Sequence, residues 1–129
     1  MQLTLKDDLP FVRIGLAYAG REVEIDDVLV DTASASTVLG AHTVAALGIQ
    51  PDTEDVLYTI RGVGGTETVY LRRVQALRVG RYAVKDVEIE IGGMQYGFAI
   101  NGILGMDLLR QVGAVIDLGQ LIITFQGQL

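Results

Sequence analysis

Val28-Leu29-Val30-Asp31-Thr32-Ala33-Ser34-Ala35-Ser36-Thr37-Val38-Leu39 is the stretch that decides the fold of this chain. An apolar run ends in an acid, small and hydroxylated residues follow, and apolar character then returns. An ionised carboxylate at the end of a buried strand is costly unless hydrogen-bond donors or a charged partner surround it. Asp31 is therefore either part of a structural hydrogen-bond network or a working group, and the rest of the chain must decide which.

Length and composition indicate one domain covering residues 1–129. Half of the residues are hydrophobic, which is enough for a substantial core. No apolar run approaches the ~18 residues that cross a bilayer, and the first residues lack the basic and apolar regions of a secretory signal. We therefore expect a cytoplasmic protein, with a domain trimmed from a larger precursor as the alternative.

Residue types exclude several classes of chemistry. The chain has no cysteine and a single histidine, His42, so disulfides, thiol nucleophiles and a multi-histidine metal site are excluded. His42 lies at the start of an expected helix, where a surface position is favoured over a catalytic one. The net charge of −6 argues against nucleic acid as a partner, because phosphate binding needs a basic surface. We expect neither a cofactor nor a metal.

The pattern of apolar residues predicts an all-β protein. Sixteen glycines accompany β-branched runs, which is typical of strands joined by tight turns. Alternation slips at Asp26-Asp27, which predicts a bulge whose two acids face solvent rather than hold a metal. Glu88 and Glu90 are also expected to face solvent, and Asp107 to lie in the first turn of a helix. Strands are expected at 3–5, 11–18, 22–30, 56–60, 68–71, 74–79, 84–91, 114–118 and 121–125, and short helices at 41–48 and 106–112.

A glycine-rich tip, Arg61-Gly62-Val63-Gly64-Gly65-Thr66, joins two of these strands. The tip lacks the lysine and the following helix of a phosphate-binding loop. It is either the turn of an ordinary hairpin or a mobile lid, since glycine permits large backbone changes.

Two segments, 28–47 and 98–112, share one layout, in which an apolar strand leads through a corner of small residues into a short helix. With the hairpin between them, the chain resembles the retroviral-type (retropepsin-like) aspartic proteases over nearly its whole length. Asp31-Thr32-Ala33-Ser34 is similar to the family signature Asp-Thr/Ser-Gly-Ala/Ser. Gly62-Val63-Gly64-Gly65 resembles the flap tip, and Ile103-Leu104-Gly105, followed by Met106-Asp107-Leu108-Leu109, resembles the second hallmark.

The resemblance implies an all-β, retropepsin-like half-barrel with one or two short helices, closed by dimerisation. It implies a homodimeric aspartic endopeptidase in which Asp31 of each copy activates a water, because this mechanism needs two carboxylates. Thr32 would hydrogen-bond across the dimer axis, and the chain termini would add strands to the interface. An extended peptide or unfolded protein would bind under the flaps. Candidate pocket residues are Val30, Tyr58, Val63 and Ile103.

Two positions of the signature raise questions. Ala33 replaces the usual glycine, which strains the loop if φ is positive and otherwise narrows the pocket. The Ser34 hydroxyl is either a donor to the Asp31 carboxylate, lowering its pKa, or a small packing residue. The alternative function is a catalytically weak or inactive dimerisation or peptide-binding module of the same fold. A third interpretation is a structural β-domain unrelated to proteases.

Overall fold

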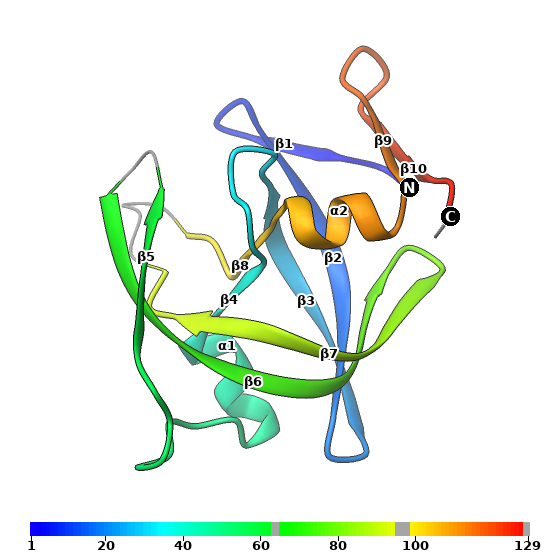
Figure 1. Cartoon of the computed structure of the whole chain (residues 1–129). Helices are drawn as coiled ribbons and strands as arrows, with labels where there is room; N and C mark the ends of the chain where they lie inside the picture. The colour runs from blue at the N-terminus through cyan, green and yellow to red at the C-terminus, as the bar shows by residue number, and fades with distance from the viewer. Residues whose placement is uncertain (63–64, 95–98, 128–129) are drawn as a thin grey trace.

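A computed structural model of the chain describes residues 1–62, 65–94 and 99–127. Figure 1 shows a strongly curved sheet with short helices beside it. The elements, in chain order, are β1 (Thr4–Lys6), β2 (Leu9–Tyr18), β3 (Arg21–Val30), β4 (Val38–Gly40), α1 (Ala41–Val44), the 3-10 turn η1 (Ala45–Leu47), β5 (Tyr58–Gly62), β6 (Gly65–Val79), β7 (Tyr82–Gly92), β8 (Gly102–Leu104), α2 (Met106–Gln111), β9 (Ala114–Asp117) and β10 (Ile122–Phe125).

In the described part of the chain, one eight-stranded sheet has the order β1-β2-β3-β8-β4-β7-β6-β5. The sheet also curls back on itself, because residues 15–17 of β2 pair with residues 76–78 of β6. β9 and β10 form a separate two-stranded hairpin. The all-β prediction is confirmed, and the closure by β2 and β6 creates an interior for the apolar side chains.

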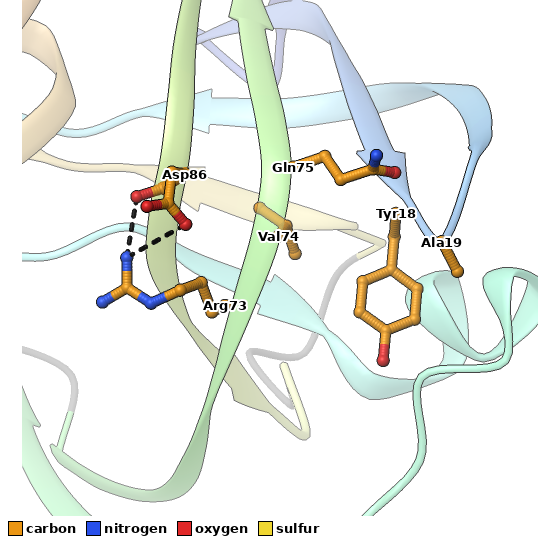
Figure 2. A pocket seen from close by; sticks show the side chains of 6 residues that line it. All are labelled: Tyr18, Ala19, Arg73, Val74, Gln75 and Asp86. Atoms are coloured by element: carbon orange, nitrogen blue, oxygen red, sulfur yellow. Dashed lines mark hydrogen bonds and ion pairs between the residues drawn. The ribbon is translucent and has the colours of Figure 1, made fainter.

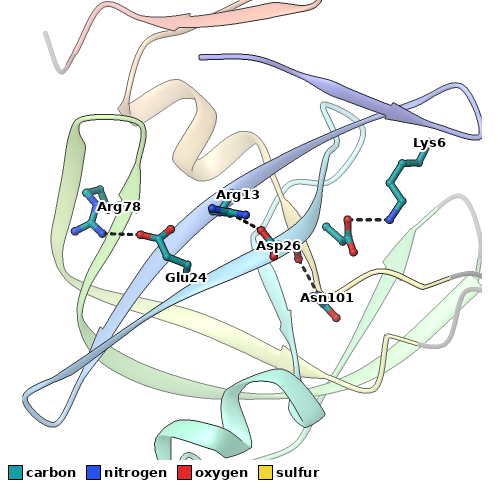
Figure 3. A network of polar contacts seen from close by, with 7 residues as sticks. Lys6, Arg13, Glu24, Asp26, Arg78 and Asn101 are labelled. Atoms are coloured by element: carbon teal, nitrogen blue, oxygen red, sulfur yellow. Dashed lines mark hydrogen bonds and ion pairs between the residues drawn. The ribbon is translucent and has the colours of Figure 1, made fainter.

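The β2–β3 hairpin turns at Ala19 and Gly20, both with positive φ, as a tight turn between twisted strands requires. Between the pairs Val12–Val28 and Ile14–Ile25, β3 contains one residue more than β2. This is the bulge predicted at Asp26-Asp27. Figure 3 shows this surface, where Asp26 pairs with Arg13 and Lys6 Nζ lies 2.8 Å from Asp27 Oδ1.

β6 is one long strand, whereas the sequence predicted two strands with a break near Arg72 and Arg73. It pairs with β7 from Val69–Gly92 to Val79–Tyr82. The two arginines interrupt the apolar alternation without bending the chain, because neither is a turn residue and each has acceptors beside the strand. Arg72 donates to Asp55 Oδ2 at 2.7 Å, and Arg73 donates to the Asp86 carbonyl at 2.7 Å.

The apolar side chains form two clusters. The larger fills the interior of the curled sheet and includes Leu16, Leu77 and Leu104, all fully buried. The smaller lies where the β5–β6 hairpin meets β2, β4 and β8. Its buried members are Phe11, Val38, Val69, Met94, Ile100 and Ile103, with Leu9, Leu29 and Ile60 packed against them. The hairpin is thus anchored to the strands on either side of the Asp31 loop.

The predicted helices are present and short. α1 and η1 end at Gly48, whose φ of 83° closes the turn as a C-terminal glycine. α2 is followed by Gly113, with φ 62°. The chain then returns in the β9–β10 hairpin, and the N-terminus runs beside it: the Leu3 amide donates to the Leu121 carbonyl and the Ile123 amide to the Met1 carbonyl.

Two turn glycines offer a matched test of packing. Gly80 (φ 60°) and Gly20 (φ 79°) both have left-handed backbone. A Cβ at Gly80 would lie 2.6 Å from Phe125 Cε2, whereas a Cβ at Gly20 would meet no atom within 4 Å. Gly→Ala strains both turns by ~1–2 kcal/mol, but only Gly80→Ala also displaces a ring, which adds about 1–3 kcal/mol.

We therefore expect Gly80→Ala to lower the free energy of unfolding in urea clearly more than Gly20→Ala does. Equal losses in the two variants would contradict this packing of Phe125.

Candidate active site

Asp31 directly follows β3, where parallel and antiparallel strand pairs meet in the sheet. β3 pairs in parallel with β8, and β8 pairs in antiparallel fashion with β4. β8 therefore lies between the strand that precedes the loop 31–37 and the strand that follows it. The Asp31 amide continues the ladder by donating to the Leu104 carbonyl at 3.0 Å, so the acid begins the loop from a fixed position.

The loop itself orients the carboxylate. The Ala33 amide donates to Asp31 Oδ1 at 2.9 Å, and the Ser34 amide donates to the Asp31 carbonyl at 3.2 Å. Asp31 is half-buried, whereas Thr32 and Ala33 are exposed. Among the described residues, the Ala33 amide is the one hydrogen-bond donor to this carboxylate, and it bonds Oδ1 rather than Oδ2.

Ala33 fits the loop without backbone strain. Its φ is not positive, so the left-handed region that would favour the signature glycine is not used here. Its amide makes the bond to Asp31 described above, and its methyl group is exposed. Of the two consequences expected from Ala33, backbone strain is absent, and a narrower substrate pocket stays a prediction.

Ser34 does not donate to the Asp31 carboxylate. Its hydroxyl donates instead to the Ser36 carbonyl at 2.7 Å, so the expected donation to the Asp31 carboxylate is wrong. The carbonyl two residues ahead competes successfully because the loop curls back upon itself. Ser34 supports the shape of the loop.

The second hallmark, residues 103–109, is hydrogen-bonded to the Asp31 loop. The Met106 amide donates to the Ser34 carbonyl at 2.8 Å, and the Asp107 amide donates to the Ala35 carbonyl at 3.2 Å. Gly105 lies so close that a Cβ there would be 2.2 Å from the Ser36 carbonyl oxygen. Glycine is required by this close approach of two main chains.

A buried threonine completes the attachment, and sequence reasoning missed it. Thr37 is 1% exposed. Its hydroxyl donates to Asp107 Oδ1 at 2.8 Å and accepts from the Gly105 amide at 3.0 Å, while its amide donates to Asp107 Oδ2 at 3.2 Å. Asp107 lies in the first turn of α2 as predicted and also accepts from the Leu108 amide. A hydroxyl six residues after Asp31, together with this acid, was the available signal.

Glu90 does not face solvent as the alternation of β7 predicted. It is half-buried, its Oε2 accepts from the Ser36 hydroxyl at 2.9 Å, and its amide donates to the Thr37 carbonyl at 3.3 Å. Burial raises the pKa of Glu90, the negative charges of Asp107 and Glu67 raise it further, and the Ser36 bond opposes them. The Asp31 loop covers the end of β7, which strand periodicity cannot reveal.

The glycine-tipped hairpin exists as β5 and β6. Arg61 pairs with Thr66 and Gly62 with Gly65, while Val63 and Gly64 lie outside the described residues. Glu67 Oε1 accepts from the Met94 amide at 2.7 Å, which ties the hairpin to the end of β7.

The three described pocket candidates are not brought together. Val30 and Ile103 are each 7% exposed and belong to different apolar clusters, on opposite faces of β3 and β8. Tyr58 is 47% exposed at the start of β5. Their contact with substrate remains a prediction.

Other candidate features lie apart from the Asp31 loop. Figure 2 shows a pocket of about 400 Å³ lined by residues of β2, β6 and β7 and the β2–β3 turn, with none from residues 31–37. His42 is exposed, and its Nε2 lies 3.2 Å from Asn101 Oδ1. Among the described residues, no group of three or more histidines, aspartates or glutamates is arranged to hold a metal, and no helix is long and apolar enough to span a membrane.

Comparison with known proteins bears on the family and the fold of the chain. The family described as aspartyl protease matches residues 15–108, from β2 into α2. The chain belongs to the aspartyl protease family. A retropepsin-like aspartic protease from Rickettsia conorii, solved by crystallography, superimposes with a TM-score of 0.65 at 19% sequence identity, covering 96% of this chain and 97% of that chain. No curated protein matches the sequence.

This member of the aspartyl protease family therefore has the retropepsin-like, all-β fold that the sequence resemblance implied. The matched residues 15–108 include the signature at Asp31, the β5–β6 hairpin and the hallmark at Gly105. The site described above thus lies within the matched range.

Gly105 allows a direct test of the loop attachment. Gly105→Ala must push apart two main chains, so we expect a loss of ~3 kcal/mol or more in the free energy of unfolding, measured by urea denaturation. The control is Gly119→Ala, whose Cβ would lie 3.4 Å from Asp117 Oδ1 in ordinary contact. Comparable losses in both variants would show that the close approach at Gly105 is not as described.

Proposed function

We propose that the chain is a homodimeric aspartic endopeptidase whose catalytic pair is Asp31 and Asp31 of a second copy. The observation that carries the proposal is the placement of Asp31. Its carboxylate is oriented by the Ala33 amide on a loop tied to β8 and α2. The chain carries one such acid, and the chemistry requires two, so the second comes from another copy.

The reaction follows from two carboxylates about 3 Å apart, which share one proton because they cannot both ionise easily. The ionised carboxylate takes a proton from water as its oxygen attacks the scissile carbonyl carbon. The protonated carboxyl donates to the carbonyl oxygen. The proton on the carbonyl-derived hydroxyl then returns to the carboxylate that donated it. The proton taken from water passes to the leaving nitrogen, so the C–N bond breaks and the carboxyl pair is restored.

Exposure supports a dimer built around the axis at Asp31. Thr32 is exposed beside the acid, and we propose that it hydrogen-bonds with its counterpart across the axis. Apolar side chains are exposed in β1 and the last hairpin, namely Leu5, Val115 and Leu118. The N-terminal residues already pair with β10 in the same chain, so this terminal unit as a whole would meet its copy.

An extended peptide or unfolded protein is the proposed substrate, bound beneath the β5–β6 hairpins acting as flaps. The hairpin root is held by Glu67 and by Ile60 and Val69 in the smaller apolar cluster. The sequence at its tip is rich in glycine, a residue that permits the backbone changes a flap would need. Pocket residues are proposed from Val30, Tyr58, Val63 and Ile103. The mechanism requires no metal or cofactor, and the acidic net charge disfavours nucleic acid.

The decisive experiment compares wild type with Asp31→Asn on an unstructured protein between pH 3 and 7. We expect cleavage by the wild type, with a bell-shaped pH profile, and none by Asp31→Asn, because the amide cannot act as base or share the proton. Activity per chain should rise with enzyme concentration, and a statine-type inhibitor should titrate one site per two chains. Cleavage that persists in Asp31→Asn would rule out this mechanism.

A substitution at Ala33 tests whether the chain is a protease or the alternative, a weak or inactive peptide-binding module. Since Ala33 has no positive φ, we expect Ala33→Gly to lower the free energy of unfolding by ~0.5–1 kcal/mol, through the greater freedom of glycine in the unfolded chain. Peptide cleavage should remain at the wild-type level. If wild type only binds peptide, and Ala33→Gly creates cleavage, the alternative is favoured.

A further inference from the structure

Two carboxylates hold adjacent residues of the Asp31 loop from opposite sides. Glu90 of β7 accepts from the Ser36 hydroxyl at 2.9 Å and donates its amide to the Thr37 carbonyl at 3.3 Å. Asp107 of α2 accepts from the Thr37 amide and hydroxyl. The mechanism described above uses neither acid, yet every bond reaches the segment that carries the reactive carboxylate.

We propose that Glu90 is a positioning residue of the active-site loop, and that the loop is held best when the Glu90 side chain is neutral. This inference goes beyond the proposed function and relies on it for its activity readout. Glu90 touches Ser36 and Thr37 rather than substrate, so its effect on Asp31 passes through the loop.

The two acids differ in the number of donors around them. Asp107 accepts from three N–H or O–H groups, those of the Thr37 amide, the Thr37 hydroxyl and the Leu108 amide. Glu90 accepts from one among the described residues, the Ser36 hydroxyl. A half-buried carboxylate with a single donor is protonated more readily than a carboxylate in water. Glu90 is therefore the acid that takes up a proton.

Burial by the loop is the largest cause that raises the pKa of Glu90. Among the described residues, the charges that act on Glu90 are those of Asp107 on α2 and Glu67 on β6, which are both negative and raise the pKa further. A neutral carboxyl still accepts from Ser36 through its carbonyl oxygen, without repelling Asp107. Protonation of Glu90 thus relieves this repulsion at the loop.

The sign of the stability effect follows from linkage. Because the folded state raises the pKa of this acid, the folded protein binds the proton more tightly than the unfolded chain does. The contribution of Glu90 to the free energy of unfolding is therefore fully present below the pKa of Glu90 in the unfolded chain. This contribution is lost as the pH rises through the pKa of Glu90 in the folded protein. Glu90→Gln, which stays neutral and keeps an acceptor, should not show this loss.

The activity experiment measures kcat and KM for peptide cleavage against pH. We expect Glu90→Gln to move the alkaline limb of kcat/KM upward by about half a pH unit or more relative to wild type. Glu88→Gln is the matched control, since Glu88 lies two residues away on the same face of β7 but is exposed. An unmoved limb in Glu90→Gln, or an equal shift in Glu88→Gln, would overturn the proposal.

Removal of the acceptor distinguishes positioning from charge alone. We expect Glu90→Ala to lower kcat at every pH with less effect on KM, because the Ser36 hydroxyl loses its partner and the loop loosens. Glu90→Gln should restore kcat at acidic pH. Failure of the amide to rescue kcat there would contradict a role through the Ser36 hydrogen bond.

A stability arm separates this inference from the proposed function. In the Asp31→Asn background, thermal unfolding is followed from pH 3 to 7 with Glu90 and with Glu90→Gln. We expect the Glu90 protein to lose more stability toward neutral pH than the Glu90→Gln protein. Parallel curves would overturn the inference even if the enzyme is active. Diverging curves, together with a wild-type chain that cleaves no substrate, would support the proton uptake at Glu90 and reject the protease function instead.

Discussion

The close approach of two main-chain segments, 34–36 and 104–107, is the constraint on which the rest of this structure depends. Amides at the start of α2 donate to carbonyls of the Asp31 loop, and the Leu104 carbonyl accepts from Asp31 itself. The distance between the segments leaves no room for a side chain at Gly105. A buried threonine hydroxyl bonded to Asp107 closes the remaining gap. Main-chain hydrogen bonds of this density hold a short loop rigid without requiring bulky residues in it.

α2 and β7 both hydrogen-bond to the Asp31 loop, so one surface of the loop packs against these elements and the other remains exposed. Thr32 and Ala33 are exposed, and the Ala33 amide bonds Oδ1 of Asp31 rather than Oδ2. The smaller apolar cluster connects this arrangement to the β5–β6 hairpin through Ile60 and Val69. A fixed loop with a hairpin packed beside it fits the proposed peptide hydrolysis, because that reaction needs the acid held in one position next to an extended chain.

The residue pattern predicted the strands, the two short helices and the bulge at Asp26-Asp27 because each has a local cause: alternation, a terminal glycine, or a slip in phase. It misplaced a break in β6, since Arg72 and Arg73 disturb alternation without being turn residues. At the site, the signature around Asp31 and the glycine of the second hallmark were visible. The partners of Ser34 and Glu90 were not, because which carbonyl or hydroxyl lies nearest depends on loop curvature and on which strand end the loop covers.

The sequence by itself determined the type of fold, the single acid at the end of β3 and the position of the glycine that the loop requires, because periodicity and residue size act over a few neighbours. Only the tertiary structure decided that Ala33 is unstrained, that Ser34 bonds to Ser36, and that Glu90 faces Asp107 across the loop. The hydrogen bonds that hold the Asp31 loop join residues up to 70 positions apart, as in the bond from Thr37 to Asp107. They arise from the curling of the sheet, which brings β4, β7, β8 and α2 together around one short stretch of chain.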